Sequence, residues 1–328
     1  MNVMITGATT PVGRALIDAL LSKPGDGWVV AVGREATADF PTHSRFCYRS
    51  ADLTHSRSVH DLLWGAANAH RIDTVFHAAQ HRATSHAGST VHAQNVTAAR
   101  ELLKGCVGHP TIRRLVVRSC AEVYAIDGGS TTLLDEEAPL DFDPRAPQWL
   151  RDRVELDLTV CAHFGTSLQI AVVRCAEIFA PDSGSQLWDY LSSRICLHSL
   201  GFDPMINVLS VEDAVSAITA ALSSKATGVF NVPGADTLPL SRAIAESFRA
   251  NIPMPGPLLA PLYALRRKVA GFEFRYDLNQ RRLHLGGVMD GTRAATLLGY
   301  VPRHPVRWPR PRWRRLLDRL AQDRSESV

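Results

Sequence analysis

The chain has 328 residues, of which 45% are hydrophobic and 21% are charged, and its formal net charge at pH 7 is +4. This balance is typical of a globular protein with about two domains' worth of core, and it excludes a disordered chain. We expect no membrane helix, because no apolar run reaches about 20 residues, and no secretory signal at the N-terminus.

Cysteine usage points to a reducing compartment. The six cysteines show no CxxC spacing and no dense framework; they are Cys47, Cys106, Cys120, Cys161, Cys175 and Cys196. In a chain of this length, such cysteines are typical of free thiols. We therefore expect a cytoplasmic protein without a zinc ribbon or any other metal site.

From residue 3 to about residue 181, short apolar runs alternate with amphipathic stretches of helical length. The pattern predicts strands at 3–6, 28–32, 74–77, 114–118 and 170–174, and helices at 11–21, 55–69 and 95–105. Strands that alternate with helices are typical of βαβ units and a parallel sheet. The sequence therefore predicts an α/β fold with a doubly wound, Rossmann-like sheet.

After residue 181 the pattern changes to helices separated by joints rich in proline and glycine. Helices are predicted at 186–196, 211–223, 240–249 and 258–269, with a marked joint at 252–257. We expect three parts: a dinucleotide-binding domain (1–181), a smaller and more helical substrate lobe (182–305), and a basic C-terminal segment (306–328).

Two basic stretches leave alternatives open. Residues 303–319 contain seven arginines and two tryptophans, which fits either a surface for anionic partners or a solvated helix. Residues 258–272 form an apolar helix that reaches three cations, which fits either a lipid or membrane contact or a core helix. We favour the solvated helix and the core helix, and so expect no nucleic-acid partner and keep contact with a membrane surface as the less favoured alternative.

A glycine turn follows the first predicted strand and opens the first helix, where a dinucleotide pyrophosphate would rest on backbone N–H groups. Gly7 allows the tight turn and Gly13 allows close packing of helix on strand. Thr10 stands at the middle glycine position and adds bulk where the phosphates approach. The predicted contacts in this turn are Gly7, Thr9, Thr10, Pro11, Val12 and Gly13.

The second predicted strand ends at Gly33 and Arg34, without the carboxylate that binds the ribose hydroxyls of NAD. A guanidinium at this position tolerates a ribose 2′-phosphate better than a bare pair of hydroxyls. NADP is therefore favoured over NAD.

Further motifs occur in the order typical of one superfamily. They are the turn at 6–13, Asp52-Leu53, the run 75–79 that ends in Ala78-Ala79, the helix start at Asn95, the strand 114–124, and the run 174–181. With these motifs, residues 1–305 resemble the extended short-chain dehydrogenases/reductases of the NAD-dependent epimerase/dehydratase type. The resemblance implies that Asp52, Leu53, Ala78, Ala79 and Asn95 contact the cofactor, and that the protein is a homodimer.

The catalytic positions depart from the superfamily pattern. The resemblance implies a Ser or Thr on the fifth strand and a Tyr-x-x-x-Lys pair on the next helix, and here these positions hold Cys120, Trp149 and Arg153. Indole N–H only donates hydrogen bonds and arginine keeps its proton. We therefore expect no standard proton transfer at this site, and a role for Arg153 in holding the cofactor's ribose or phosphate.

Two neighbouring residues are candidate substitutes. Glu122 stands where sugar dehydratases of the superfamily carry a base, and it serves either as a base or as an ion-pair partner of an arginine such as Arg118 or Arg153. Tyr124 either donates a hydrogen bond to substrate or packs as a strand-end aromatic.

Three functions are consistent with these residues. The first is an NAD(P)-binding enzyme of the epimerase/dehydratase type that acts on a nucleotide-sugar-like substrate with an altered catalytic set. The second is a catalytically degenerate relative that acts as a binding or regulatory protein. The third is an oxidoreductase-like protein for a lipid or sterol.

Overall fold

The apolar runs of the N-terminal half form a seven-stranded parallel sheet. The computed structural model describes residues 1–81, 83–84, 86–127, 133–271 and 273–309. All neighbouring strands of the sheet are parallel. In spatial order the strands are β11 (Gly228–Val232), β7 (Gln169–Cys175), β5 (Arg114–Cys120), β4 (Thr74–His77), β1 (Val3–Thr6), β2 (Val29–Gly33) and β3 (Phe46–Ser50).

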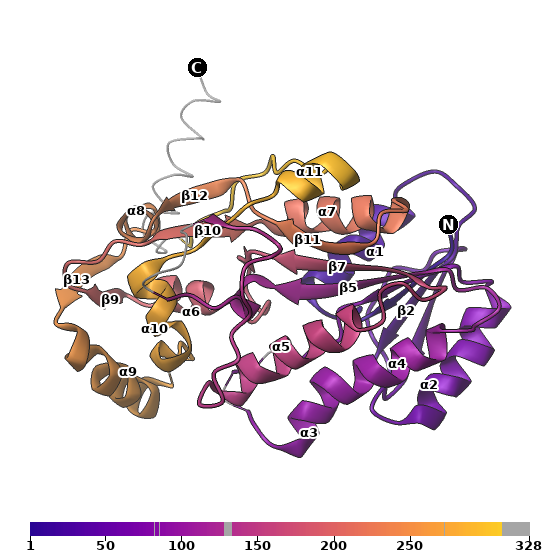
Figure 1. Cartoon of the computed structure of the whole chain (residues 1–328), viewed down its shortest axis with the longest axis horizontal. Helices are drawn as coiled ribbons and strands as arrows, with labels where there is room; N and C mark the ends of the chain where they lie inside the picture. Colours follow the sequence, from indigo (N-terminus) through magenta and orange to yellow (C-terminus); the bar gives the residue numbers. More distant parts are fainter. Residues whose placement is uncertain (82, 85, 128–132, 272, 310–328) are drawn as a thin grey trace.

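Helices cover both faces of this sheet (Figure 1). On one side lie α1 (Pro11–Leu21), α7 (Val211–Ser223) and α11 (Thr292–Leu298). On the other lie α2 (Ser56–Leu62, continued to Ala67), the run α3 (Ser89–His92) to α4 (Ala98–Cys106), and α5 (Gln148–Cys161). Side chains alternate between two cores, with Val116 in one and Leu115 and Val117 in the other. The doubly wound fold is confirmed.

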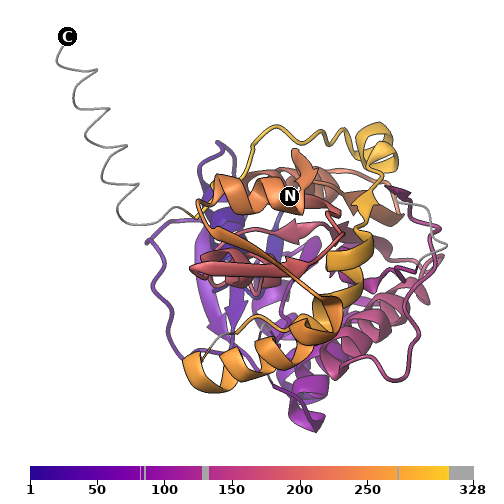
Figure 2. The same ribbon diagram turned by 90° about the vertical axis from the view of Figure 1, so that its left-hand side faces the viewer.

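The small lobe has its own aromatic core, around Tyr190, Tyr263 and Phe274. Figure 2 shows this lobe end-on, with α9 and α10 in front of the sheet. Its helices are α6 (Gln186–Ser192), α8 (Leu240–Glu246), α9 (Gly256–Ala270) and α10 (Tyr276–Leu285). Its strands are β8 (Glu177–Ile178), β9 (Ile195–Ser199), β10 (Met205–Leu209), β12 (Asp236–Pro239) and β13 (Ala250–Met254). A further pair, β6 (Leu133–Leu134) and β14 (Val288–Met289), links the two parts.

The predictions for the small lobe were wrong in three places. The helix expected at 240–249 ends at Glu246, shortly before β13 begins at Ala250. The helix expected at 186–196 ends at Ser192, because residues from Ile195 onward form β9. The joint expected at 252–257 begins inside β13, which pairs only with β9. Pro253 is tolerated there because a strand with one partner has an edge that makes no ladder hydrogen bonds. The lobe is therefore less helical than predicted.

The division at residue 181 stays a prediction, but the chain crosses it again. α7 and β11 lie in the predicted substrate lobe, and yet β11 pairs with β7 at the edge of the large sheet. The C-terminal part of the chain thus completes the sheet that the N-terminal part begins.

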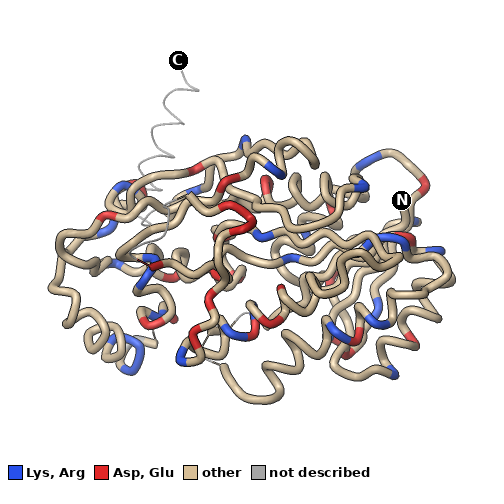
Figure 3. Tube along the Cα trace, in the orientation of Figure 1, with Lys and Arg blue, Asp and Glu red and all other residues tan. Residues whose placement is uncertain are grey.

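The structure describes only part of the two basic stretches, 303–319 and 258–272. Acidic and basic residues are interspersed along the described trace (Figure 3). Residues 310–328, which include most of the predicted basic segment, lie outside the described residues; before them, Trp308 packs on Phe179 with ring centroids 5.1 Å apart. In α9, Leu259 and Tyr263 are buried while Val269 is 79% exposed. Within the described ranges, no helix has the length and apolar character to cross a membrane.

Candidate active site

The turn after β1 has the geometry of a phosphate cradle. Gly7 adopts φ +71°, and a Cβ there would lie 2.7 Å from the carbonyl carbon of Ala78, so only glycine fits. Thr10 caps α1: its hydroxyl accepts from the Gly13 N–H at 3.0 Å and donates to the Gly7 carbonyl at 2.8 Å. The Thr10 side chain is therefore used within the turn and is only 7% exposed.

A cavity of about 780 Å³ opens beside this turn, at the carboxyl ends of β1, β2 and β4. We call it the larger cavity. Its volume lies within the usual range for ligand sites, roughly 300–1,000 Å³. The small lobe closes it through Trp188, Asp189 and Glu273. The predicted cofactor residues that line it are Gly7, Thr9, Thr10, Gly33, Arg34, Asp52, Leu53 and Ala79.

The other predicted cofactor residues do not line the larger cavity. Pro11, Val12 and Gly13 form the first turn of α1 behind it, and Ala78 is fully buried. The Asn95 side chain is occupied, since its amide donates to Asp152 and its oxygen accepts from the His81 N–H. Arg153 lines a second cavity, described below.

Glu35 also lines the larger cavity and was missed. Its carboxylate accepts from the Thr9 hydroxyl at 3.2 Å, and its carbonyl accepts from the Tyr48 hydroxyl at 2.7 Å. The hydrogen bond from its own backbone N–H, followed by that from Thr9, lowers the pKa of Glu35. A carboxylate thus stands one residue beyond Arg34, the last residue considered in the ribose position.

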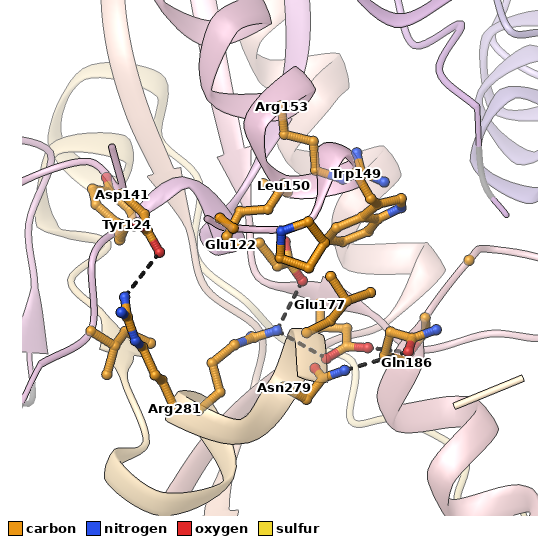
Figure 4. A pocket seen from close by; sticks show the side chains of 18 of the residues that line it. Glu122, Tyr124, Asp141, Trp149, Leu150, Arg153, Glu177, Gln186, Asn279 and Arg281 are labelled. Atoms are coloured by element: carbon orange, nitrogen blue, oxygen red, sulfur yellow. Dashed lines mark hydrogen bonds and ion pairs between the residues drawn. The ribbon is translucent and has the colours of Figure 1, made fainter. Parts of the chain in front are cut away.

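A second cavity of about 230 Å³ adjoins the larger one, and we call it the smaller cavity. All five residues predicted at catalytic positions line it: Cys120, Glu122, Tyr124, Trp149 and Arg153. Figure 4 shows Trp149, Leu150 and Arg153 on the side opposite Asn279 and Arg281. Gln80 and residues 184–186 line both cavities.

Cys120 is held as a neutral thiol. Burial, followed by the charge of Glu122, raises the pKa of this thiol well above its usual range. Its register partner across the sheet, Cys175, is also buried, which raises the pKa of that thiol to about 12. Neither sulfur is a thiolate near neutral pH, so neither has the form that acts as a nucleophile.

Glu122 forms an ion pair, but not with the arginines suggested from the sequence. Its partner is Arg282 of α10, whose Nη1 lies 2.9 Å from Glu122 and 3.4 Å from Glu177. Burial opposes ionisation of Glu122, but the charges of Arg282 and Arg153 outweigh it and lower its pKa. Burial raises the pKa of Glu177. Glu122 is therefore an ionised acceptor.

Tyr124 is engaged in a buried network. Its hydroxyl donates to Asn231 at 2.6 Å and accepts from Arg174 at 3.0 Å, and the residue is only 2% exposed. Burial raises the pKa of Tyr124 to about 12. These contacts leave its hydroxyl committed to protein partners.

Trp149 and Arg153 stack on one another. The Arg153 guanidinium lies 3.8 Å from the centroid of the indole, and its Nη1 donates to Gln80 at 2.7 Å. Both side chains keep a buried donor, Trp149 Nε1 and Arg153 Nε, that meets no acceptor within the described part of the chain.

Arg118 was not predicted as a site residue, yet it lines the smaller cavity. Burial, together with the nearby Arg153 charge, lowers its pKa. The smaller cavity is also lined by Gln80, Glu177, Arg281 and Arg282. Of these, only Glu177 falls in a motif noted from the sequence, and α10 carries no local signal that its arginines reach the site. Among residues 1–309 as described, no three His, Cys, Asp or Glu side chains gather to hold a metal ion.

Comparison with known proteins gives one family over most of the chain. The family model described as "NAD dependent epimerase/dehydratase family" matches residues 3–232. Two curated relatives span almost the whole chain. An uncharacterised protein of Mycobacterium tuberculosis is 27% identical over 92% of this chain and 80% of its own length. A 3-diazoavenalumate denitrifying reductase of a Streptomyces species is 28% identical over 93% of this chain and 97% of its own length.

Solved structures share the fold at low identity. UDP-glucuronic acid 4-epimerase of Bacillus cereus, in complex with UDP-glucuronic acid and NAD, superposes with a TM-score of 0.68 at 17% identity, over 93% of this chain and 95% of that one. dTDP-glucose 4,6-dehydratase of Bacillus anthracis, in complex with NAD, gives 0.67 at 15% identity, over 93% and 92%.

Proposed function

This chain belongs to the NAD dependent epimerase/dehydratase family, and we propose that it binds a nicotinamide dinucleotide in the larger cavity and acts on a substrate in the smaller one. The observation that carries this proposal is the contact between the two cavities. They share Gln80 and residues 184–186, and the larger one begins at the glycine turn. A cofactor that lies along the larger cavity would thus end beside the smaller one.

The residues present fit such a cofactor. The turn from Gly7 to α1 would hold the pyrophosphate on backbone N–H groups at a helix N-terminus. Asp52 and Leu53 line the same cavity. When bound, a nicotinamide would supply or accept a hydride.

Of the five residues at the catalytic positions, Glu122 is the one that could accept a proton. Arg282 keeps it ionised, whereas the buried Cys120 thiol, the Trp149 indole and the Arg153 guanidinium do not exchange protons near neutral pH. We infer a reaction in which the usual phenol and amine take no part, and in which Glu122 accepts a proton or a hydrogen bond from the substrate.

Two substrate classes follow. The two structural neighbours described above are enzymes of nucleotide sugars, and nucleotide sugars remain the first hypothesis for this chain. The arginines of α10 weigh against a diphosphate, because Arg281 already pairs with Asp141 and Asp143, and Arg282 with Glu122 and Glu177. The second is a reductase of a small molecule, like the Streptomyces relative, which suits a site without a proton-transferring pair.

The choice between NAD and NADP depends on two adjacent residues. Arg34 favours a 2′-phosphate, as expected from the sequence, whereas the ionised Glu35 would accept from ribose hydroxyls and repel a phosphate. The preference for NADP stays a prediction. Titration of Arg34→Gln and Glu35→Gln with both cofactors tests it: loss of NADP affinity in the first supports it, and a gain of NADP affinity in the second shows that Glu35 opposes it.

Titration with reduced cofactor tests the proposed function itself. Saturable binding of NADH or NADPH, followed by the fluorescence of the dihydronicotinamide, is the expected result. Failure to bind either at millimolar concentration would overturn the enzyme hypothesis and leave the binding or regulatory protein. The homodimer stays a prediction, which light scattering on the purified protein checks.

A further inference from the structure

Three side chains that only donate hydrogen bonds stand together in the smaller cavity: Arg118, Trp149 and Arg153. We call them the donor cluster. The Arg118 guanidinium has no hydrogen-bond or ion-pair partner among the residues that the structure describes, although it lines the cavity. Trp149 is 8% exposed and its Nε1 lacks a partner, as does Nε of Arg153. Arginine and tryptophan side chains have no acceptor atoms, so the partner that this cluster lacks is an acceptor.

The neighbouring arginine on β5 shows how a structural guanidinium behaves here. Arg114 lies four residues before Arg118, on the same face of the strand. Its Nε donates to the Ala221 carbonyl at 2.7 Å and its Nη2 to the Ala226 carbonyl at 2.9 Å, and its Nη1 is without a partner among the described residues. Arg118 has no such contacts, so the fold does not account for its charge.

The cofactor does not account for it either. Arg118 lines the smaller cavity and is absent from the wall of the larger one, where the glycine turn would hold the pyrophosphate. Its charge therefore faces the space that we assign to the substrate.

The volume and the apolar wall of the smaller cavity limit which ligands it can hold. A volume of about 230 Å³ lies below the usual range for ligands of drug size, roughly 300–1,000 Å³. Part of its wall is apolar, formed by Ile126, Leu150 and Ile178.

The carboxylates that line the smaller cavity all have arginine partners outside the donor cluster. Glu122 and Glu177 pair with Arg282, Asp141 and Asp143 pair with Arg281, and Asp277 pairs with Arg275. Neither Arg118 nor Arg153 forms an ion pair with a described carboxylate, so an anionic group of a ligand would find unpaired positive charge at the donor cluster.

From these observations we propose that the smaller cavity binds a small organic carboxylate with an apolar body, and that Arg118 is the residue that holds its carboxylate. The inference rests on the proposed function, because it names the substrate class for the same site. It assigns Arg118 a binding role that is separate from the cofactor and from the α10 arginines.

Benzoate and benzamide are a matched pair of probes, equal in shape and different in charge. Their binding is measured by isothermal titration on the protein saturated with NADH and on the protein alone. Wild type is expected to bind benzoate at least tenfold more tightly than benzamide. The Arg118→Gln variant should bind benzoate at least tenfold more weakly than wild type and bind benzamide with unchanged affinity. The Arg118→Lys variant should recover part of the lost benzoate affinity. The control is Arg151→Gln, an exposed change on α5 with the same loss of charge.

The outcomes separate the two proposals. Equal affinity of wild type for benzoate and benzamide overturns the carboxylate site without reference to any variant. An equal loss of benzoate affinity in Arg151→Gln also overturns the carboxylate site. Tight binding of UDP-glucose that depends on Arg118 would overturn it as well. If benzoate binds through Arg118 but neither NADH nor NADPH binds, the carboxylate site stands and the proposed function fails.

Discussion

Two arginines, Arg174 buried and Arg118 partly buried, lie on neighbouring strands of one sheet and have opposite surroundings. Arg174 on β7 forms a two-point ion pair with Asp157 at 2.7 and 3.0 Å and donates to the Tyr124 hydroxyl. Arg118 on β5 lines the smaller cavity without a partner among the described residues. The first arginine ties β5, β7, β11 and α5 together, because Tyr124 continues the network to Asn231.

The comparison separates a charge that is paired within the fold from a charge that is available to bind a ligand. A buried ion pair contributes little net stability, but removal of one partner leaves a costly unpaired charge. A cation that the fold leaves unpaired already carries that cost, which is characteristic of a site that awaits a ligand. Variants at the two regions should therefore change stability in opposite directions.

The largest effect is expected at Arg174. Arg174→Met would leave Asp157 buried without a charged partner, with the Ser119 hydroxyl at 2.5 Å and the Cys161 thiol at 3.6 Å as its remaining donors. We expect the free energy of unfolding to fall by about 3–5 kcal/mol. Urea unfolding measures this, with Arg151→Met as the exposed control. A loss of unfolding free energy below about 1 kcal/mol would contradict the proposed contrast between Arg174 and Arg118.

A large effect of pH is expected at His77, which lies beside Arg118. Burial, followed by the Arg118 charge, lowers the pKa of His77 to about 4, and its Nε2 has no partner within the described residues. Because the unfolded chain takes up this proton near pH 6.5, stability is complete above that pH and falls as the pH drops toward 4. Between pH 7 and 5 wild type should lose roughly 2 kcal/mol more than His77→Gln. Urea unfolding at the two pH values checks this, and parallel losses in both proteins would contradict it.

An intermediate effect is expected for Tyr124→Phe. The change removes one donor to Asn231 and one acceptor for Arg174 but leaves the Arg174–Asp157 pair intact. We expect a loss of about 1–3 kcal/mol. A thermal melt compared with that of Arg174→Met ranks the two, and a larger loss in Tyr124→Phe would show that the hydroxyl, not the ion pair, dominates the network.

The smallest effect, with the opposite sign, is expected for Arg118→Leu. Removal of an unpaired, partly buried charge should cost no stability and should raise the free energy of unfolding by up to about 1 kcal/mol. The pKa of His77 should rise as well, because a cation beside it is gone. Histidine NMR signals follow that titration, and a loss of stability would show that Arg118 has a structural partner.

The sequence predicted the large sheet because its strands are continuous apolar runs and its first helix has clear ends. Thr10 caps α1 and Lys23-Pro24-Gly25 follows its last turn, so the predicted bounds match those observed. The small lobe was harder, since β9 and β13 are short, half-exposed strands without strict alternation. The return of β11 to the sheet depends on a contact between distant segments, which local patterns do not carry.

The site was predictable where motifs are local. Cys120, Glu122, Trp149 and Arg153 were placed by the resemblance to family motifs at the end of β5 and in α5, and all four line the smaller cavity. Arg282 was missed because it reaches Glu122 from 160 residues away. Arg118 was noted only as an ion-pair partner for Glu122, since a sequence does not show which arginine lacks one.

The position of Gln80 implies that the two binding equilibria are not independent. Its amide nitrogen donates to the Arg118 carbonyl at 2.7 Å and its oxygen accepts from Arg153, so the side chain is held at both ends between the two cavities. A molecule in the larger cavity that draws this amide toward itself would release Arg153 within the smaller one, which Arg153 lines. By thermodynamic reciprocity, each occupant then alters the affinity for its neighbour by the same factor, and turnover would show a preferred order of addition.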